Sequence, residues 1–207
     1  MSNALDGLYA QAAEATHAGS HTFYFATRFF PPDLARAAHA VYWFSGYTRG
    51  LGRQAGTAAQ GRLDLDLWAA QVDRGLRGQL VRNPVLEVFL DAVDRHKIPH
   101  RFATELIEGA RMDVNHRRYQ NFGQLREYCS RSTGAMSILM AHLIGHRGPA
   151  LEYMADLGLA MELTSILRTV RNALERNRIY LPLDEIEAFG YSKPSCAGIR
   201  ATPRSAP

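Results

Sequence analysis

Apolar residues recur at three- and four-residue intervals along almost the whole chain, and no segment alternates apolar and polar positions over the length of a strand. This period places apolar side chains on one face of a helix, so the pattern predicts an all-α protein. The predicted helices span residues 4–18, 22–30, 33–49, 64–80, 83–96, 99–115, 122–145 and 150–175, with a short helix at 184–189.

The end of the chain differs from the rest in its pattern. From 193 to 207 prolines, a glycine and small polar residues follow one another without any helical period. Such a composition favours irregular structure over a packed helix. We therefore expect one helical domain over residues 1–192, which is within the usual domain size, and a disordered tail over 193–207.

Composition narrows the classes of partner. The 207 residues are 46% hydrophobic and 21% charged, and the net charge of +4 comes from arginines scattered along the chain. Because no basic run or tail is present, a nucleic-acid partner is not expected.

The longest apolar stretch, 133–145, is shorter than the roughly 20 residues that cross a bilayer. The start lacks a secretory signal, so we expect a cytoplasmic protein and leave peripheral membrane contact open.

The first segment with candidate chemistry is the start of the second predicted helix. Ser20, His21, Thr22 and Phe23 lie there. Free backbone N–H groups and the positive end of the helix dipole favour an anion such as a phosphate at this place. The alternative is simple capping of the helix by a hydroxyl, which needs no ligand.

The second candidate segment is an aromatic-rich helix over residues 38–53. It carries Tyr42 and ends with glycines and the arginines Arg49 and Arg53. Aromatic faces can stabilise a carbocation, and guanidinium groups can hold a diphosphate. The alternative is an aromatic core stripe that ends in a glycine cap.

The third candidate segment covers residues 161–182. On a helix, Glu162, Ser165, Arg168 or Thr169, and Asn172 fall near one face and form a polar stripe. Further arginines, among them Arg171 and Arg178, make an anion site plausible there. The alternative is a solvated face of the helix.

In order along the chain, these segments resemble the squalene/phytoene synthase family. Residues 20–32 resemble its Ser-x-Ser-Phe and Leu-Pro-Pro segments, and 40–44 resemble its Ala-Val-Tyr-x-Phe helix. The remaining matches are 106–113 with 118–119, 125–129, 163–168 and 176–182; the last is similar to Arg-Gly-Arg-Ile-Tyr-Leu-Pro.

The resemblance implies an isoprenoid synthase-type helical bundle around a central cavity, which condenses two prenyl diphosphates with the help of magnesium. The residues expected to bind substrate are Ser20, His21, Thr22, Phe23, Tyr42, Arg49, Arg53, Tyr128, Ser165, Arg168, Arg171, Arg178 and Tyr180. No catalytic residue is assigned, and whether the chain is an enzyme is left open.

The sequence departs from the family at both aspartate clusters. Residues 49–53 stand where the family has Asp-Asp-x-x-Asp, and 169–173 stand where it has Asp-x-x-x-Asp; neither segment contains a carboxylate. Magnesium needs oxygen ligands and usually one or two carboxylates. We therefore expect no metal ligand and no cofactor, although the family uses magnesium.

A second departure is length, since the family continues past the Tyr-Leu-Pro segment. We expect the last helices of the bundle to be missing, with a homo-oligomer or a partner protein covering the exposed apolar faces. The leading function is a divergent prenyltransferase acting on an isoprenoid diphosphate. The alternatives are a non-catalytic isoprenoid-binding or protein-assembly factor that retains the fold, and a decayed gene product.

Overall fold

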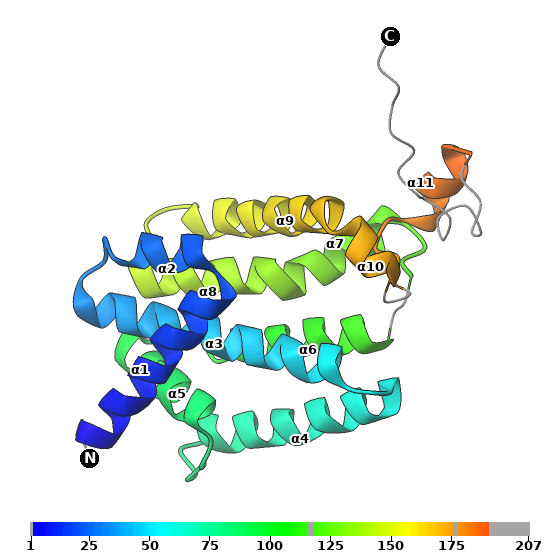
Figure 1. The fold of residues 1–207 in the computed structure, drawn as a ribbon. Helices are drawn as coiled ribbons and strands as arrows, with labels where there is room; N and C mark the ends of the chain where they lie inside the picture. The colour runs from blue at the N-terminus through cyan, green and yellow to red at the C-terminus, as the bar shows by residue number, and fades with distance from the viewer. Residues whose placement is uncertain (1, 116–117, 176–177, 191–207) are drawn as a thin grey trace.

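The computed structural model describes residues 2–115, 118–175 and 178–190, and these residues form a bundle of helices (Figure 1). In chain order the helices are α1 (Ser2–Gly19), α2 (His21–Thr27), α3 (Pro32–Gln54), α4 (Ala58–Leu76), α5 (Pro84–His96), α6 (Arg101–Asn115), α7 (Phe122–Cys129), the π-helical turn η1 (Ser130–Gly134), α8 (Ala135–Ile144), α9 (Ala150–Arg168), α10 (Val170–Glu175) and α11 (Leu183–Ala188). No strand occurs in the described ranges; one parallel bridge joins Arg118 to Ile179.

The central helix of the bundle is α3, which packs against α1, α4, α5, α6 and α8. On one side α4 forms an edge of the molecule, and on the other side α9 forms the opposite edge, beyond α7 and α8 (Figure 1). The helix α9 packs against α7, η1 and α8. Among the residues that the structure describes, many side chains on its other side are exposed.

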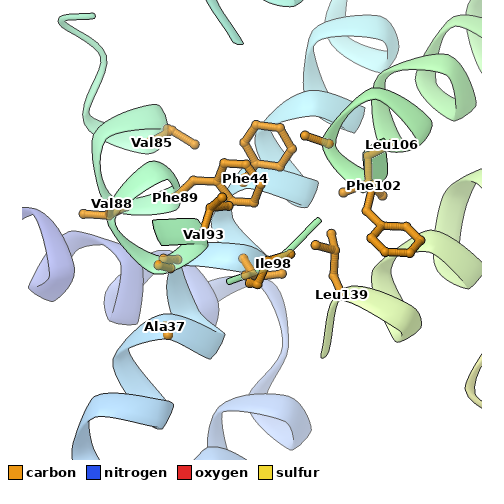
Figure 2. Packing of buried hydrophobic residues seen from close by; sticks show 14 of the residues in the cluster. Ala37, Phe44, Val85, Val88, Phe89, Val93, Ile98, Phe102, Leu106 and Leu139 are labelled. Atoms are coloured by element: carbon orange, nitrogen blue, oxygen red, sulfur yellow. The ribbon is translucent and has the colours of Figure 1, made fainter. Parts of the chain in front are cut away.

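The main hydrophobic core lies where α3, α5, α6 and α8 meet (Figure 2). The rings of Phe44 and Phe89 stack with centroids 3.8 Å apart. Beside them the indole N–H of Trp68 donates to the buried hydroxyl of Thr48 at 2.9 Å. Burial of these aromatic rings supplies much of the stabilisation of the bundle.

Two predicted boundaries around Arg49 are wrong. The helix α3 does not end at Arg49 but continues through two glycines to Gln54. A Cβ on Gly52 would lie 2.6 Å from a methyl group of Val114, so this glycine permits close packing of α3 on α6 rather than ending the helix. The next helix begins at Ala58, not at residue 64, because the Thr57 hydroxyl accepts from the backbone N–H of Gln60 at 3.1 Å.

The predicted helix over 150–175 is divided in two by Thr169. This residue has φ −112° and ψ 15°, and its hydroxyl donates to the carbonyl of Ser165 at 2.8 Å. Such side-chain bonds compete with helical ones and bend or end a helix. The predicted tail 193–207 lies outside the described residues, and the domain boundary at 192 stays a prediction. Among the described residues, none of the helices is both long and apolar enough for a membrane span.

Glycines allow two helices to approach the π-helical turn closely. A Cβ on Gly109 of α6 would lie 2.8 Å from the carbonyl oxygen of Arg131. A Cβ on Gly158 of α9 would lie 2.7 Å from the Cα of Gly134. Both contacts are with backbone atoms, which cannot rotate away as a side chain can. The turn η1 is thus held between α6 and α9.

We expect Gly109→Ala to lower the free energy of unfolding by about 2 kcal/mol, because the added methyl group must push α6 away from η1. The control is Gly46→Ala on α3, where a Cβ meets no atom within 4 Å. That change should raise the stability by up to about 1 kcal/mol, since alanine favours a helix. Urea unfolding of both variants measures the difference, and equal midpoints would contradict the packing described here.

Candidate functional site

A pocket lined by several charged and polar side chains lies between the end of α3, α6 and the α9–α10 junction. It has a volume of about 460 Å³, within the range of small-molecule sites. It is lined by Gly52, Arg53, Ala55, Gly56, Thr57, Ala58, Asp113, Val114, Glu162, Ser165, Ile166, Thr169, Asn172, Ala173, Arg178 and Tyr180. Residues from both 49–53 and 169–173, the two segments expected from the sequence to lack the aspartate clusters, therefore contribute to this one pocket.

A buried carboxylate, Asp113 near the end of α6, organises one wall of the pocket. Its Oδ2 accepts from the Nε of Arg53 at 2.9 Å and from the Nη1 of Arg178 at 2.8 Å. Its Oδ1 accepts a short hydrogen bond from the hydroxyl of Tyr180. Asp113 is only 6% exposed, whereas the side chains of Arg53 and Arg178 are 37% and 22% exposed. The two guanidinium groups thus lie between a buried anion and the open pocket.

Backbone pairing places Arg178 and Tyr180 beside α6. Ile179 forms the parallel bridge with Arg118. Just beyond, the backbone N–H of Leu183 donates to the carbonyl of Tyr119 at 3.0 Å. These bonds fix residues 178–180 against residues 118–119, so that the side chains on either side of Ile179 reach Asp113.

The charges in this wall stabilise one another. Burial alone would raise the pKa of the Asp113 carboxyl, but the charge of Arg53, the hydrogen bond from Tyr180 and the charge of Arg178 lower it below its ordinary value. Burial would lower the pKa of both guanidinium groups, but the charge of Asp113 raises it above the ordinary value. Asp113 is therefore ionised and both arginines are positive at neutral pH.

A second buried carboxylate, Glu162 of α9, lines the pocket from the side of the π-helical turn. It accepts a short hydrogen bond from the hydroxyl of Thr133 in η1 and a long one, 3.5 Å, from the hydroxyl of Tyr128. The Nη2 of Arg53 also approaches the Tyr128 oxygen at 3.5 Å. Tyr128 and Arg53 together thus connect Glu162 to Asp113. The hydroxyl of Thr133 comes from the π-helical turn, and such turns are frequent at functional sites.

Three tyrosine rings stand behind the polar wall. Tyr128 lies 5.5 Å from Tyr119 and 5.6 Å from Tyr180 between ring centroids. Burial and the charge of Asp113 raise the pKa of the Tyr128 and Tyr180 hydroxyls, so both remain neutral donors. This arrangement combines fixed cations, hydroxyl donors and aromatic faces at one end of a pocket.

The residues of the pocket do not fit a magnesium ion. Its carboxylates are Asp113 and Glu162, and both oxygens of Asp113 already bind Arg53, Arg178 or Tyr180. Two guanidinium charges beside Asp113 would repel a divalent cation, and magnesium prefers an octahedron of oxygen ligands. Within the ranges that the structure describes, no three His, Cys, Asp or Glu side chains converge on a metal position.

The predicted substrate-binding residues fall into two groups. Arg53, Ser165, Arg178 and Tyr180 line the pocket, and Tyr128 contacts Arg53 beside it. The polar stripe expected on residues 161–182 also faces the pocket, with Glu162, Ser165, Thr169 and Asn172 in its lining.

The other residues predicted to bind substrate do not line this pocket, and their role in binding stays a prediction. Ser20 caps α2 by accepting from the backbone N–H of Phe23 at 3.2 Å, and Phe23 stacks on Tyr42 with centroids 5.0 Å apart. The members of this second group are Ser20, His21, Thr22, Phe23, Tyr42, Arg49, Arg168 and Arg171.

Sequence reasoning did not include Asp113, Glu162 or Thr133 among the substrate-binding residues. Asp113 lies within a segment similar to the family, and Glu162 lies on the polar stripe. The sequence therefore contained a feature by which each could have been identified. No sequence feature identifies Thr133, because its position depends on the π-helical turn.

Comparison with known proteins agrees with the resemblance read from the sequence. The profile of the family "Squalene/phytoene synthase" matches residues 16–204. A phytoene synthase of Mycobacterium bovis is 31% identical over 192 residues, covering 90% of this chain and 61% of the relative. A phytoene synthase of Thermus thermophilus is 34% identical over 190 residues, covering 90% of this chain and 63% of the relative. The chain thus spans less than two thirds of the length of these relatives.

Solved structures share the fold. A dehydrosqualene synthase in complex with ligand matches with a TM-score of 0.85 at 23% identity, over 94% of this chain and 68% of that one. A squalene synthase of Alicyclobacillus acidocaldarius matches with a TM-score of 0.84 at 22% identity, over 96% of this chain and 75% of that one. The predicted all-α, isoprenoid synthase-type fold is confirmed. On the evidence of its sequence profile and relatives, this chain belongs to the squalene/phytoene synthase family.

Proposed function

We propose that this chain is a squalene/phytoene synthase-like prenyltransferase that acts on isoprenoid diphosphates without the two aspartate-rich metal motifs. The observation that supports this most is the pair of guanidinium groups, Arg53 and Arg178, at the wall of the pocket that both substituted segments line. Planar guanidinium groups bind phosphate oxygens in a bidentate manner. The diphosphate would therefore be held directly by arginines.

Asp113 positions the two arginines in this proposal. Its buried carboxylate binds each of them on one edge, so their remaining edges face the pocket at little further cost in side-chain entropy. Ser165, Thr169 and Asn172 line the other side and can donate to phosphate oxygens. When the carbon–oxygen bond to the diphosphate lengthens, the developing negative charge would be stabilised by these fixed donors.

The hydrocarbon part of the substrate would lie towards the apolar side of the pocket. A small crevice of about 30 Å³ adjoins it and shares Ile166, Ala173 and Tyr180 with it. This crevice can hold only the first carbons of a prenyl chain. The described residues therefore support recognition of the diphosphate and do not set the chain length.

A second candidate function is binding of an isoprenoid diphosphate without turnover. The observation that favours it is the charge balance of the lining, where Asp113 and Glu162 offset Arg53 and Arg178. A leaving diphosphate carries several negative charges, and a pocket without net positive charge stabilises it less than bound metal ions do. In this alternative the fold is retained for recognition alone.

Isothermal titration with farnesyl diphosphate, once with magnesium and once with EDTA, tests the proposal. We expect equal affinity under both conditions, because arginines and not a metal hold the diphosphate. Release of inorganic diphosphate in a parallel assay would support the prenyltransferase, and binding without release would support the non-catalytic alternative. Binding that requires magnesium, or no binding at all, would contradict both.

A further inference from the structure

The two buried carboxylates of the pocket differ in their partners. Asp113 binds two guanidinium groups. Glu162 is equally buried, at 7% exposed, but its hydrogen bonds come from two neutral hydroxyls, those of Thr133 and Tyr128. Within the part of the chain that the structure describes, no arginine, lysine or histidine forms an ion pair with Glu162. Its negative charge therefore lacks a counter-charge among these residues.

A carboxylate of this kind at the wall of a pocket indicates a cationic ligand. Buried charges in proteins are usually paired, because removing a charge from water is costly. Hydroxyl donors orient a carboxylate without cancelling its charge. Since Glu162 lines the pocket, a positive group bound there would supply the missing counter-charge. We call Arg53 and Arg178 the anion subsite and Glu162 the cation subsite.

One small molecule can occupy both subsites. The Nη2 of Arg53 and the Oε1 of Glu162 each lie 3.5 Å from the oxygen of Tyr128, so these two atoms are at most about 7 Å apart. In an allylic diphosphate the first carbon of the chain is bonded directly to a diphosphate oxygen. A diphosphate bound to Arg53 can therefore place that carbon next to Glu162.

We propose that Glu162 stabilises the positive charge that forms on the substrate when the diphosphate leaves. In this step the bond between the first carbon and the diphosphate oxygen breaks, and both electrons leave with the oxygen. The positive charge that remains is shared by the allylic carbons. Glu162 forms no bond and takes no proton. Because the substrate carries no such positive charge before the bond breaks, the carboxylate favours the transition state over the bound substrate.

Thr133 is a positioning residue in this proposal. Its hydroxyl comes from the turn η1 and donates a short hydrogen bond to the Oε2 of Glu162, while the hydroxyl of Tyr128 approaches Oε1. A carboxylate held at both oxygens needs little reorganisation when the cation forms. The proposal rests on the proposed function for its reaction, whereas binding of a stable cation at Glu162 requires no turnover.

Titration with farnesylamine, in inorganic diphosphate and EDTA, tests the cation subsite. The amine is protonated at neutral pH, as that of lysine is, and neutral farnesol is the matched ligand. Glu162→Gln should weaken binding of the amine by roughly 10-fold or more, because glutamine keeps the hydrogen-bond acceptor but not the charge. Its affinity for farnesol should not change. The control Glu152→Gln, at an exposed position of the same helix, should bind both ligands like the wild type.

Farnesyl diphosphate separates binding from the reaction. In Glu162→Gln its affinity should be unchanged or tighter, because a negative charge near the diphosphate is removed. Release of inorganic diphosphate should slow by about 100-fold, as when one preorganised transition-state partner is lost. A merely structural role would instead weaken binding of farnesol and farnesyl diphosphate as well. Thr133→Val should reproduce the weaker binding of the amine, and Thr133→Ser should restore the wild-type affinity.

The outcomes distinguish this proposal from the proposed function. If farnesyl diphosphate binds but the amine binds equally to the wild type and to Glu162→Gln, the cation subsite is overturned and the proposed function stands. If the amine depends on Glu162 but farnesyl diphosphate does not bind, the proposed function falls and the cation subsite stands. Equal weakening in Glu162→Gln and Glu152→Gln would indicate long-range attraction and overturn the cation subsite. A wild type that releases no diphosphate would overturn the role of Glu162 in the reaction.

Discussion

Asp113→Asn should lower the free energy of unfolding by about 3 kcal/mol. The change preserves the shape of the side chain but leaves two guanidinium groups, those of Arg53 and Arg178, side by side without their buried counter-charge. Breaking a buried ion pair by removing one partner costs about 3–5 kcal/mol. We expect a loss at the lower end of this range because the side chain of Arg53 is 37% exposed and can turn towards water. The urea midpoint of the variant measures the loss.

The pH dependence of stability separates the charge of Asp113 from its shape. The folded-state pKa of this carboxyl is lowered, so its contribution is present above the unfolded pKa of about 3.9 and is lost as pH falls through the folded pKa. The wild type should therefore lose more stability than Asp113→Asn as the pH falls from 5 towards the folded pKa. Parallel curves for the two proteins would contradict the role given to the charge.

A double variant tests whether Asp113 and Arg178 form an ion pair that stabilises the protein. Adding Arg178→Gln to Asp113→Asn removes one of the two uncompensated charges. If the ion pair is real, the combined loss of stability should be smaller than the sum of the single losses, as for residues that share one interaction. An additive result would show that Asp113 and Arg178 act separately.

Much of the helical architecture could be predicted because the apolar period is a local property of the sequence. The same reasoning placed Glu162, Ser165, Thr169 and Asn172 on one face of a helix, and these four residues line the pocket. Helix ends were less predictable where tertiary packing decides. Gly52 indicates the end of a helix by propensity, yet it lies within α3 because Val114 approaches it closely.

The centre of the candidate site could not be derived from local pattern. Asp113 and Arg53 are 60 residues apart in the sequence, and Tyr180 is 67 residues from Asp113. Only the packing of α3 on α6 and the bridge at Ile179 bring them together. Sequence resemblance identified the segments in which these residues lie, but not that one carboxylate holds both arginines.

Arg53→Gln should weaken the binding of farnesyl diphosphate by roughly 10- to 100-fold, the usual effect of losing a hydrogen bond to a charged group. The fold should survive, because Asp113 keeps its bonds from Arg178 and Tyr180. Glutamine retains a hydrogen-bond donor, so the change removes the charge and the bidentate geometry more than the volume. Titration in EDTA measures the affinity without any contribution from a metal.

The matched control for Arg53 is Arg77→Gln, directly after the end of α4, which removes an equal charge from an exposed arginine paired with Asp73. Long-range attraction of an anionic substrate would weaken equally in both variants and disappear at high salt. Direct contact predicts instead that only Arg53→Gln loses affinity, and that the loss persists in salt. If both variants bind like the wild type, the diphosphate does not lie against Arg53, and the pocket assignment falls with it.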